Sequence, residues 1–225
     1  MDTNVFRTWI TSAAGVIEAN RDHLTQLDAA IGDADHGINL SRGFTAVLAA
    51  LDAKPADTPG AVLVLAGSTL ISKVGGASGP LYGMAFRRAG QALGSAAEVD
   101  LPALGQALDA ALAGVQQLGA AREGDKTMVD ALAPAARALA KAVTEGAAQG
   151  DALTAAAAAA AEGAAATVSM QARKGRASYL GPRSVGHEDP GAASIALILA
   201  ALRDAAAAVT GAPSPRTGEQ RFPRE

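Results

Sequence analysis

The sequence contains no cysteine, and aromatic residues make up only 3% of its 225 residues. The lack of thiols excludes disulfides, zinc–thiolate sites and cysteine nucleophiles, and it is compatible with a reducing compartment. The chain also has no basic tract, a net charge of −3 and few rings on which bases could stack. We therefore expect no binding to nucleic acid.

Signals for export or membrane insertion are also missing from the sequence. The N-terminus lacks a basic region followed by an apolar core, which a secretory signal would show. No apolar run reaches membrane-spanning length without a glycine, polar or charged interruption. We expect a cytoplasmic protein that makes no contact with a membrane.

What is present is dominated by alanine and by helical periodicity. β-Branched residues are scarce and alternating patterns are hardly seen, so we expect no strands. Alanine has the best helix propensity, and its small side chain lets helices approach closely. The helical patterns cover 5–27, 38–53, 58–73, 80–95, 100–118, 126–146, 150–171 and 190–210.

The short connections between these helices predict antiparallel neighbours. The fold class is therefore all-α, with eight helices in an up-and-down array that forms one domain over residues 1–211. Asp57-Thr58 and Asp100 suit helix N-caps, each followed by a proline in the first turn. Residues 212–225 carry three prolines and mixed charge, which predicts a disordered tail.

Three aspartates, Asp28, Asp33 and Asp35, fall within eight residues at the junction of two helical patterns. Carboxylates packed so closely repel one another, and a bound Mg²⁺ or Ca²⁺ removes the repulsion. Gly32 is predicted to end the first helix, and the loop lets the three side chains converge. The amides that begin the next helix, near Ile38, would then favour phosphate. A solvated turn is the alternative, whereas an EF-hand fails at its glycine and glutamate positions.

Two glycine-rich segments follow. In residues 75–83, the glycines would let backbone lie against a ligand and Ser78 offers a hydroxyl to phosphate, although a flexible connection is the alternative. Residues 119–130 approach a phosphate-binding P-loop, but Asp125 is inserted and no strand precedes it, so we reject that interpretation. Asp125 is instead predicted to be the N-cap of the next helix. Met128 suits either an apolar base pocket or the core.

A third segment carries four cations within eleven residues, between Arg173 and Arg183. Lysine and arginine offset phosphate charge, and arginine grips it bidentately; a solvated helix end is the alternative. Asp189-Pro190 is predicted to begin the last helix. His36 and His187 are candidate proton carriers, although a lone loop histidine is more often structural.

Taken together, these motifs form a recognisable set in a fixed order. They are Asp28-x4-Asp33-x-Asp35-His36-Gly37-x-Asn39, Gly76-Ala77-Ser78-Gly79-Pro80, Asp125-Lys126-Thr127-Met128, the segment 174–181, and Asp189-Pro190-Gly191-Ala192. The sequence resembles the nucleotide-binding L subunit of dihydroxyacetone kinase, the DhaL family, over about residues 1–210. The resemblance implies a barrel of eight antiparallel helices with ADP or ATP held by the loops at one end.

The resemblance also implies roles for individual residues. Two Mg²⁺ ions would be held by Asp28, Asp33 and Asp35, and Arg176 would compensate charge during phosphoryl transfer. The nucleotide contacts would be His36, Gly37, Ile38, Asn39, Ala77, Ser78, Gly119, Met128, Arg176, Asp189, Pro190 and Gly191.

The implied activity is that of a phosphotransferase, a kinase subunit that passes phosphate from Mg-bound nucleotide to dihydroxyacetone held on a separate K subunit. The phosphate could come from exchanged ATP, or from an M-type protein of the phosphotransferase system that rephosphorylates bound ADP. Related trioses or tetroses remain candidate substrates. A nucleotide-loaded regulatory or co-activator protein without transfer activity is the alternative, and a Mg-dependent phosphate-ester hydrolase is a third.

Overall fold

The computed structural model describes residues 1–54 and 56–210. Over that part of the chain it consists of α-helices and short 3-10 segments, without a β-strand, as the sequence predicted. The predicted tail, 212–225, lies outside the described residues. The helices are α1 Thr3–Ala19, α2 Arg21–Ile31, α3 His36–Ala53, α4 Pro59–Lys73, α5 Ser78–Leu93, α6 Leu101–Gly119, α7 Val129–Thr144, α8 Gln149–Ala166 and α9 Pro190–Thr210, with 3-10 segments η1 Thr167–Ser169 and η2 Arg176–Ser184.

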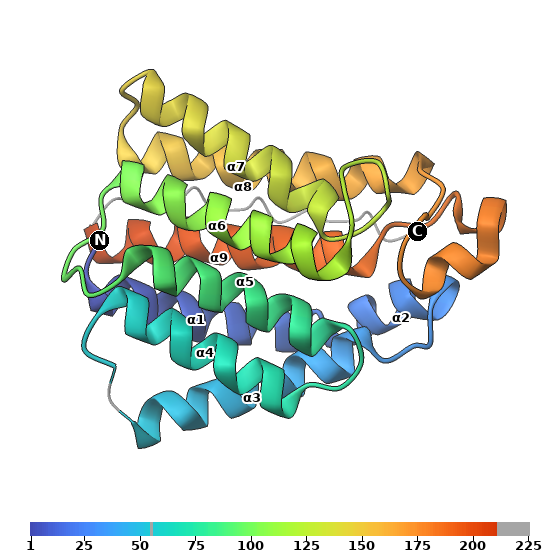
Figure 1. Ribbon diagram of the computed structural model, residues 1–225, viewed down its shortest axis with the longest axis horizontal. Coiled ribbons are helices and arrows are strands. Elements are labelled where there is room, and N and C mark those ends of the chain that lie inside the picture. The colour runs from blue at the N-terminus through green and yellow to red at the C-terminus, as the bar shows by residue number, and fades with distance from the viewer. Residues whose placement is uncertain (55, 211–225) are drawn as a thin grey trace, which may run out of the picture.

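The long helices lie side by side along the long axis of the molecule (Figure 1), and their contacts close a ring. Each of α3 to α8 packs on the next helix in chain order, α1 packs on α3, and α9 packs on α1. The shorter α2 prolongs the α1 side of the ring and packs on α3, α9 and η2. The predicted barrel of eight antiparallel elements is confirmed, with α1 and α2 together as its first element.

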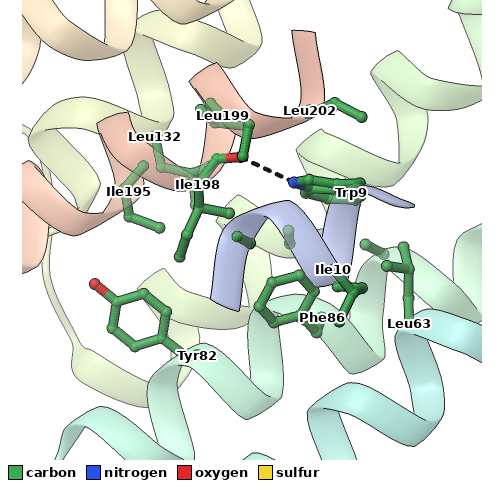
Figure 2. Packing of buried hydrophobic residues seen from close by; sticks show 14 of the residues in the cluster. Trp9, Ile10, Leu63, Tyr82, Phe86, Leu132, Ile195, Ile198, Leu199 and Leu202 are labelled. Carbon is green, nitrogen blue, oxygen red and sulfur yellow. Dashed lines mark hydrogen bonds between the residues drawn. The ribbon is translucent and has the colours of Figure 1, made fainter. Parts of the chain in front are cut away.

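Large apolar side chains fill the inside of the ring. Trp9 lies between α1 and α9, where its indole N–H donates to the carbonyl oxygen of Ile198 at 2.8 Å (Figure 2). Its ring centroid lies 5.8 Å from that of Phe86 on α5. One aromatic residue of α1 therefore contacts both α5 and α9.

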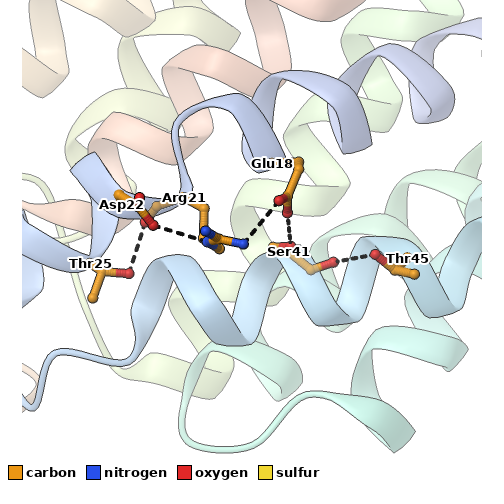
Figure 3. A network of polar contacts seen from close by, with 6 residues as sticks. All are labelled: Glu18, Arg21, Asp22, Thr25, Ser41 and Thr45. Carbon is orange, nitrogen blue, oxygen red and sulfur yellow. Dashed lines mark hydrogen bonds and ion pairs between the residues drawn. The ribbon is translucent and has the colours of Figure 1, made fainter.

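The predicted helix 5–27 is broken at Asn20, which is the main departure from the expected elements. Asn20 turns its side chain back to the carbonyl oxygen of Val16, 2.8 Å away, and so ends α1. Beyond the break, Arg21 pairs with Glu18, whose carboxylate accepts a hydrogen bond from Ser41 of α3 (Figure 3). The local side-chain bonds of asparagine override the continuing helical pattern.

The predicted helix starts are largely confirmed. Thr58 accepts from the amide of Ala61 at 3.1 Å, and Asp100 accepts from the amide of Ala103 at 2.8 Å. Asp189 caps α9 by accepting from the amide of Ala192 at 2.7 Å. These caps satisfy amides that have no partner inside the helix.

Two stretches, 149–169 and 190–209, are long and apolar enough to span a membrane by length and composition alone. This differs from the sequence expectation, because runs of alanine count as apolar even where glycine or glutamate interrupts them. In the barrel, α8 packs against α7 and α9, and α9 packs against α1. Such packing is typical of helices in the core of a bundle.

Candidate functional site

A cavity of about 290 Å³ opens at the end of the barrel where the α2–α3, α4–α5, α6–α7 and α8–α9 connections meet. These connections contain the three glycine-rich segments and the aspartate cluster that the sequence singled out. The cavity is therefore built from four segments that are far apart in the chain.

The three aspartates converge on one side of this cavity. Asp28 lies in the last turn of α2, Asp33 and Asp35 lie in the connection to α3, and one ligand atom from each lies within 4.8 Å of the others. Asp28 is buried, whereas Asp33 is exposed, so the cluster opens outward from α2. A group of three carboxylates offers the hard oxygen donors that Mg²⁺ prefers.

Asp28 also caps the N-terminus of α3. Its Oδ2 accepts from the amides of Asp35, at 2.8 Å, and His36, at 3.1 Å, and so caps α3 from the neighbouring helix. A Cβ at Gly32 would lie 2.0 Å from Oδ1 of Asp28, so only glycine allows the carboxylate this position. Gly32 ends α2, as predicted.

Arg176 reaches the cluster from a different connection of the chain. Its Nη2 lies 3.1 Å from Oδ2 of Asp33, although the arginine side chain is 69% exposed. Arg176 belongs to η2, in the long connection between α8 and α9. The structure therefore brings the predicted cation to the predicted carboxylates.

His36 forms part of the cavity wall, with both ring nitrogens in hydrogen-bond contact. Nδ1 lies 3.2 Å from Oγ of Ser78, and Nε2 lies 2.9 Å from Oγ of Ser194, which also contacts the Tyr82 hydroxyl. Burial lowers the pKa of His36 to about 4, opposed by the charge of Asp28. These contacts favour a structural His36 over a proton carrier. His187 is exposed and does not line the cavity.

Most of the remaining predicted nucleotide contacts line the cavity. Ala77, Ser78, Gly119 and Met128 line the cavity together with Asp189, Pro190 and Gly191. The cavity also has apolar lining from Leu81, Val115 and Ala121.

Asp189 is a buried carboxyl in the cavity wall. Burial raises the pKa of Asp189 to about 7, although its bond from the Ala192 amide favours the charged form. Lys126 and Asp130 lie close enough to influence it, with opposite signs.

Three predicted nucleotide contacts do not line the cavity. A Cβ at Gly37 would lie 2.0 Å from the carbonyl oxygen of Arg21, so Gly37 lets α3 pack tightly on α2. Ile38 is 50% exposed, and Asn39 accepts from Nη2 of Arg42 at 2.9 Å. All three residues lie in the first turn of α3, and their nucleotide contacts stay predictions.

The α6–α7 connection corrects one prediction. Asp125 does not cap α7, because its Oδ2 accepts from the amide of Arg122 at 2.9 Å and closes a turn. Asp130 organises the loop instead, accepting from the amides of Gly124, at 2.6 Å, and Thr127, at 2.7 Å. The helix begins three residues later than predicted, at Val129.

Sequence reasoning also missed Lys126, Tyr82 and Ser194. Lys126 is 1% exposed and Ser194 is fully buried. The near-match to a P-loop drew attention to Lys126 as a member of a motif, but nothing local showed where its side chain goes. Ser194, inside an apolar helix, carried no signal.

Comparison with known proteins is consistent with this geometry. The DAK2 domain family profile matches residues 30–204. The chain is 43% identical, over 88% of its length and 94% of the relative, to the PEP-dependent dihydroxyacetone kinase ADP-binding subunit DhaL of Escherichia coli. It is 42% identical to L-erythrulose 1-kinase of Mycolicibacterium smegmatis over 81% of this chain, which corresponds to 32% of that protein.

A solved structure shows the same fold. The dihydroxyacetone kinase of C. freundii in complex with AMP-PNP and Mg²⁺ superposes with a TM-score of 0.65 at 30% identity. The superposition covers 87% of this chain and 33% of that one. The present chain is thus similar to about a third of that kinase.

Proposed function

The chain belongs to the DAK2 domain family, and on this premise we propose that it is the nucleotide-binding subunit of a dihydroxyacetone kinase. The observation that carries the proposal is the meeting of three carboxylates, an arginine and an apolar chamber in one cavity. The similarity to an ADP-binding subunit over 94% of that subunit's length supports it. The proposed nucleotide-binding domain is residues 1–211.

Asp28, Asp33 and Asp35 would hold Mg²⁺, two ions in our proposal. The donor set fits, because carboxylate oxygens from three residues approach within 4.8 Å and the cluster faces the cavity. The bound cations would neutralise charge on the nucleotide's phosphate oxygens. Asp28 is held by the amides of Asp35 and His36 at the start of α3, so this side of the site is preorganised on a helix end.

The shape of the cavity supports one orientation of the nucleotide. The apolar walls at Leu81, Val115 and Met128 suit the base, and the phosphates would extend toward the aspartates and Arg176. Arg176 would compensate charge that develops as phosphorus moves from the nucleotide oxygen to the acceptor oxygen. Its planar guanidinium provides several donors for this task. No side chain of this site needs to act as a nucleophile.

We propose that the acceptor, dihydroxyacetone, is held on a separate K subunit that docks over the cavity opening. Four cations in the α6–α7 and α8–α9 connections, Arg122, Arg173, Lys174 and Arg183, form no ion pair within the described residues. An acidic surface on the partner would complement them.

The structure also shows exposed apolar side chains at this end of the barrel. The largest is Tyr179 of η2, which is 88% exposed, and Leu118 is 47% exposed. An aromatic side chain so exposed beside unpaired cations is a suitable anchor for a protein partner.

The test is a reconstitution in which the purified chain, Mg²⁺, ATP and dihydroxyacetone are mixed with and without a K-type subunit. We expect dihydroxyacetone phosphate only when the K subunit is present, because this cavity holds no second site for the sugar in our proposal. A second series replaces ATP by a phosphotransferase-system M-type donor and bound ADP, which distinguishes the two phosphate sources.

Sugar-dependent turnover by the chain alone would contradict the proposal that a separate K subunit holds the sugar. Nucleotide binding without transfer to any K-type subunit, with either donor, would instead favour a regulatory protein loaded with nucleotide.

A further inference from the structure

Lys126 is a buried cation for which the proposed transfer has no use. It is 1% exposed and lies in the α6–α7 connection with a φ of 61°, in the left-handed region that side-chain-bearing residues rarely adopt. The loop around it is tightly bonded, because Asp130 accepts from the amides on both sides of it. A buried ammonium in this loop needs hydrogen-bond acceptors close by.

The ammonium holds the two ends of a different segment. Nζ donates to the carbonyl oxygen of Thr167 at 2.6 Å and also to the carbonyl oxygen of His187. Thr167 begins η1 directly after α8, whereas His187 lies just before α9. One side chain therefore closes the base of the 167–189 connection, which carries Arg176 in its middle and Asp189 at its end.

Other bonds reinforce the same junction. The amide of Asp189 donates to Oγ1 of Thr167 at 2.9 Å, and the amide of Gly186 donates to the carbonyl oxygen of Val168 at 2.7 Å. The amide of Arg173 donates to the carbonyl oxygen of Asp125 at 3.0 Å. Among these contacts, only the bonds of Lys126 tie the α6–α7 loop to both ends of the connection.

Nearby carboxylates also favour a charged Lys126 at this position. Asp189, Asp130 and Glu188 all lie near enough to favour the charged form of Lys126, while burial lowers its pKa. Each carbonyl partner only accepts, so each requires an N–H from the ammonium. Removing the ammonium would leave the buried carbonyl of Thr167 and the partly buried carbonyl of His187 without this donor, and the neighbouring carboxylates without their cation.

We propose that Lys126 is a positioning residue, which clamps the base of the 167–189 connection so that Arg176 stays beside the aspartates and Asp189 stays in the cavity wall. Its consequence for nucleotide binding rests on the proposed function, whereas the clamp itself does not.

The test compares Lys126→Met, which keeps the length of the side chain but removes its donors, with Lys141→Met. Lys141 is exposed on α7 and pairs only with Glu145, so it serves as the matched control. Amide hydrogen exchange is measured without nucleotide, and Mg·ADP affinity is measured by calorimetry well below the melting temperature.

In Lys126→Met we expect amides of the 167–189 connection to exchange at least tenfold faster, with amides of α4 and α5 within twofold of wild type. We also expect the dissociation constant for Mg·ADP to rise at least tenfold, and neither change in Lys141→Met. Unchanged exchange in the connection of a folded Lys126→Met variant would overturn the clamp. If the wild-type chain binds no Mg·ADP, the proposed function fails. The hydrogen-exchange data then still test whether Lys126 clamps the 167–189 connection.

A measurement on the wild-type chain covers the case in which Lys126→Met does not fold. With ¹⁵N-labelled lysine, one ammonium signal among the five lysines should be protected from exchange with water. Coupling of that nitrogen to the carbonyl carbons of Thr167 and His187 would identify it. Rapid exchange of all five ammonium groups would refute the proposal.

Discussion

At the scale of single residues, the aspartate cluster combines two kinds of carboxylate. Asp28 uses one oxygen to cap α3 and keeps the other toward Gly32, whereas Asp33 and Asp35 have no capping bond. Substitution of Asp28 would therefore disturb the fold and the site together. Asp33 and Asp35 allow the site to be tested alone.

We expect Asp33→Asn and Asp35→Asn each to weaken Mg-dependent ADP binding at least tenfold, because an amide oxygen carries no full charge to offer Mg²⁺. Calorimetry with and without Mg²⁺ measures the effect, and circular dichroism checks that the helices remain. Asp22→Asn on α2, whose side chain is 79% exposed and pairs with Arg21, is the control. Mg-dependent affinity equal to wild type in both variants would contradict the metal assignment.

Asp189 supplies a prediction about pH. Its folded-state pKa of about 7 lies above the unfolded value, so the folded chain binds more protons between about pH 4 and pH 7. This contribution to stability is therefore present at low pH and is lost as pH rises through 7. Lys126 and Asp130 also influence Asp189, and Asp189 in turn influences Tyr82 on α5.

Asp189→Asn removes the titration and keeps a residue that caps helices well. We expect the free energy of unfolding of wild type relative to this variant to fall by about 1–3 kcal/mol between pH 5 and pH 8. Urea unfolding at several pH values without nucleotide measures it. A difference that does not change with pH would show that Asp189 does not titrate between pH 5 and pH 8.

At the scale of elements, α4 and α5 pack closely through glycine. A Cβ at Gly67 would lie 2.5 Å from the carbonyl oxygen of Gly83, and a Cβ at Gly90 would lie 2.5 Å from the carbonyl oxygen of Gly60. Both clashes are with backbone, which cannot rotate away. Close approach of these two helices positions the α4–α5 connection, and with it Ser78, at the cavity.

Gly67→Ala should therefore lower the free energy of unfolding by about 1–3 kcal/mol, because the added methyl pushes the helices apart. Gly105→Ala on α6 is the matched control, since nothing lies within 4 Å of its Cβ. There the change should raise stability by about 0.5–1 kcal/mol through helix propensity. Equal effects of the two substitutions in denaturant titrations would show that the close packing is not stabilising.

At the scale of the whole molecule, the cavity exists only when the ring is closed, because its wall combines four connections. A ligand of this cavity should therefore bind the folded chain and not the unfolded one. At 100 times its dissociation constant, such a ligand adds about 2.7 kcal/mol to the free energy of unfolding.

We expect Mg·ADP to raise the melting temperature by several degrees, roughly the shift that this free energy gives for a chain of this size. Differential scanning calorimetry measures it, with ADP plus a chelator as one control and the Asp33→Asn variant as another. An identical shift in the chelator sample would mean that ADP binds without the aspartate cluster.

Much of the fold could be predicted because its signals are local. The caps at Thr58 and Asp100 depend on residues three positions apart, and the helical patterns depend on spacing along one segment. The break at Asn20 was missed because the apolar pattern continues across it, and only a side-chain bond to Val16 reveals it.

The candidate site was predicted only in part, for the same reason. Asp28, Asp33 and Asp35 are neighbours in the chain, so their convergence follows from one turn. At Gly37 an added Cβ would lie 2.0 Å from the carbonyl oxygen of Arg21 on α2, a helix contact that the local sequence did not reveal, and the nucleotide contact of Gly37 stays a prediction.

The sequence by itself determined the helices, their order and the chemistry of each connection, since these depend on interactions over a few residues. The tertiary structure decided which side chains meet. Ser194 contacts His36 across 158 positions, and Lys126 reaches Thr167 and His187 from another loop. Such contacts depend on how every helix of the ring packs on the next, and no short stretch of sequence contains that information.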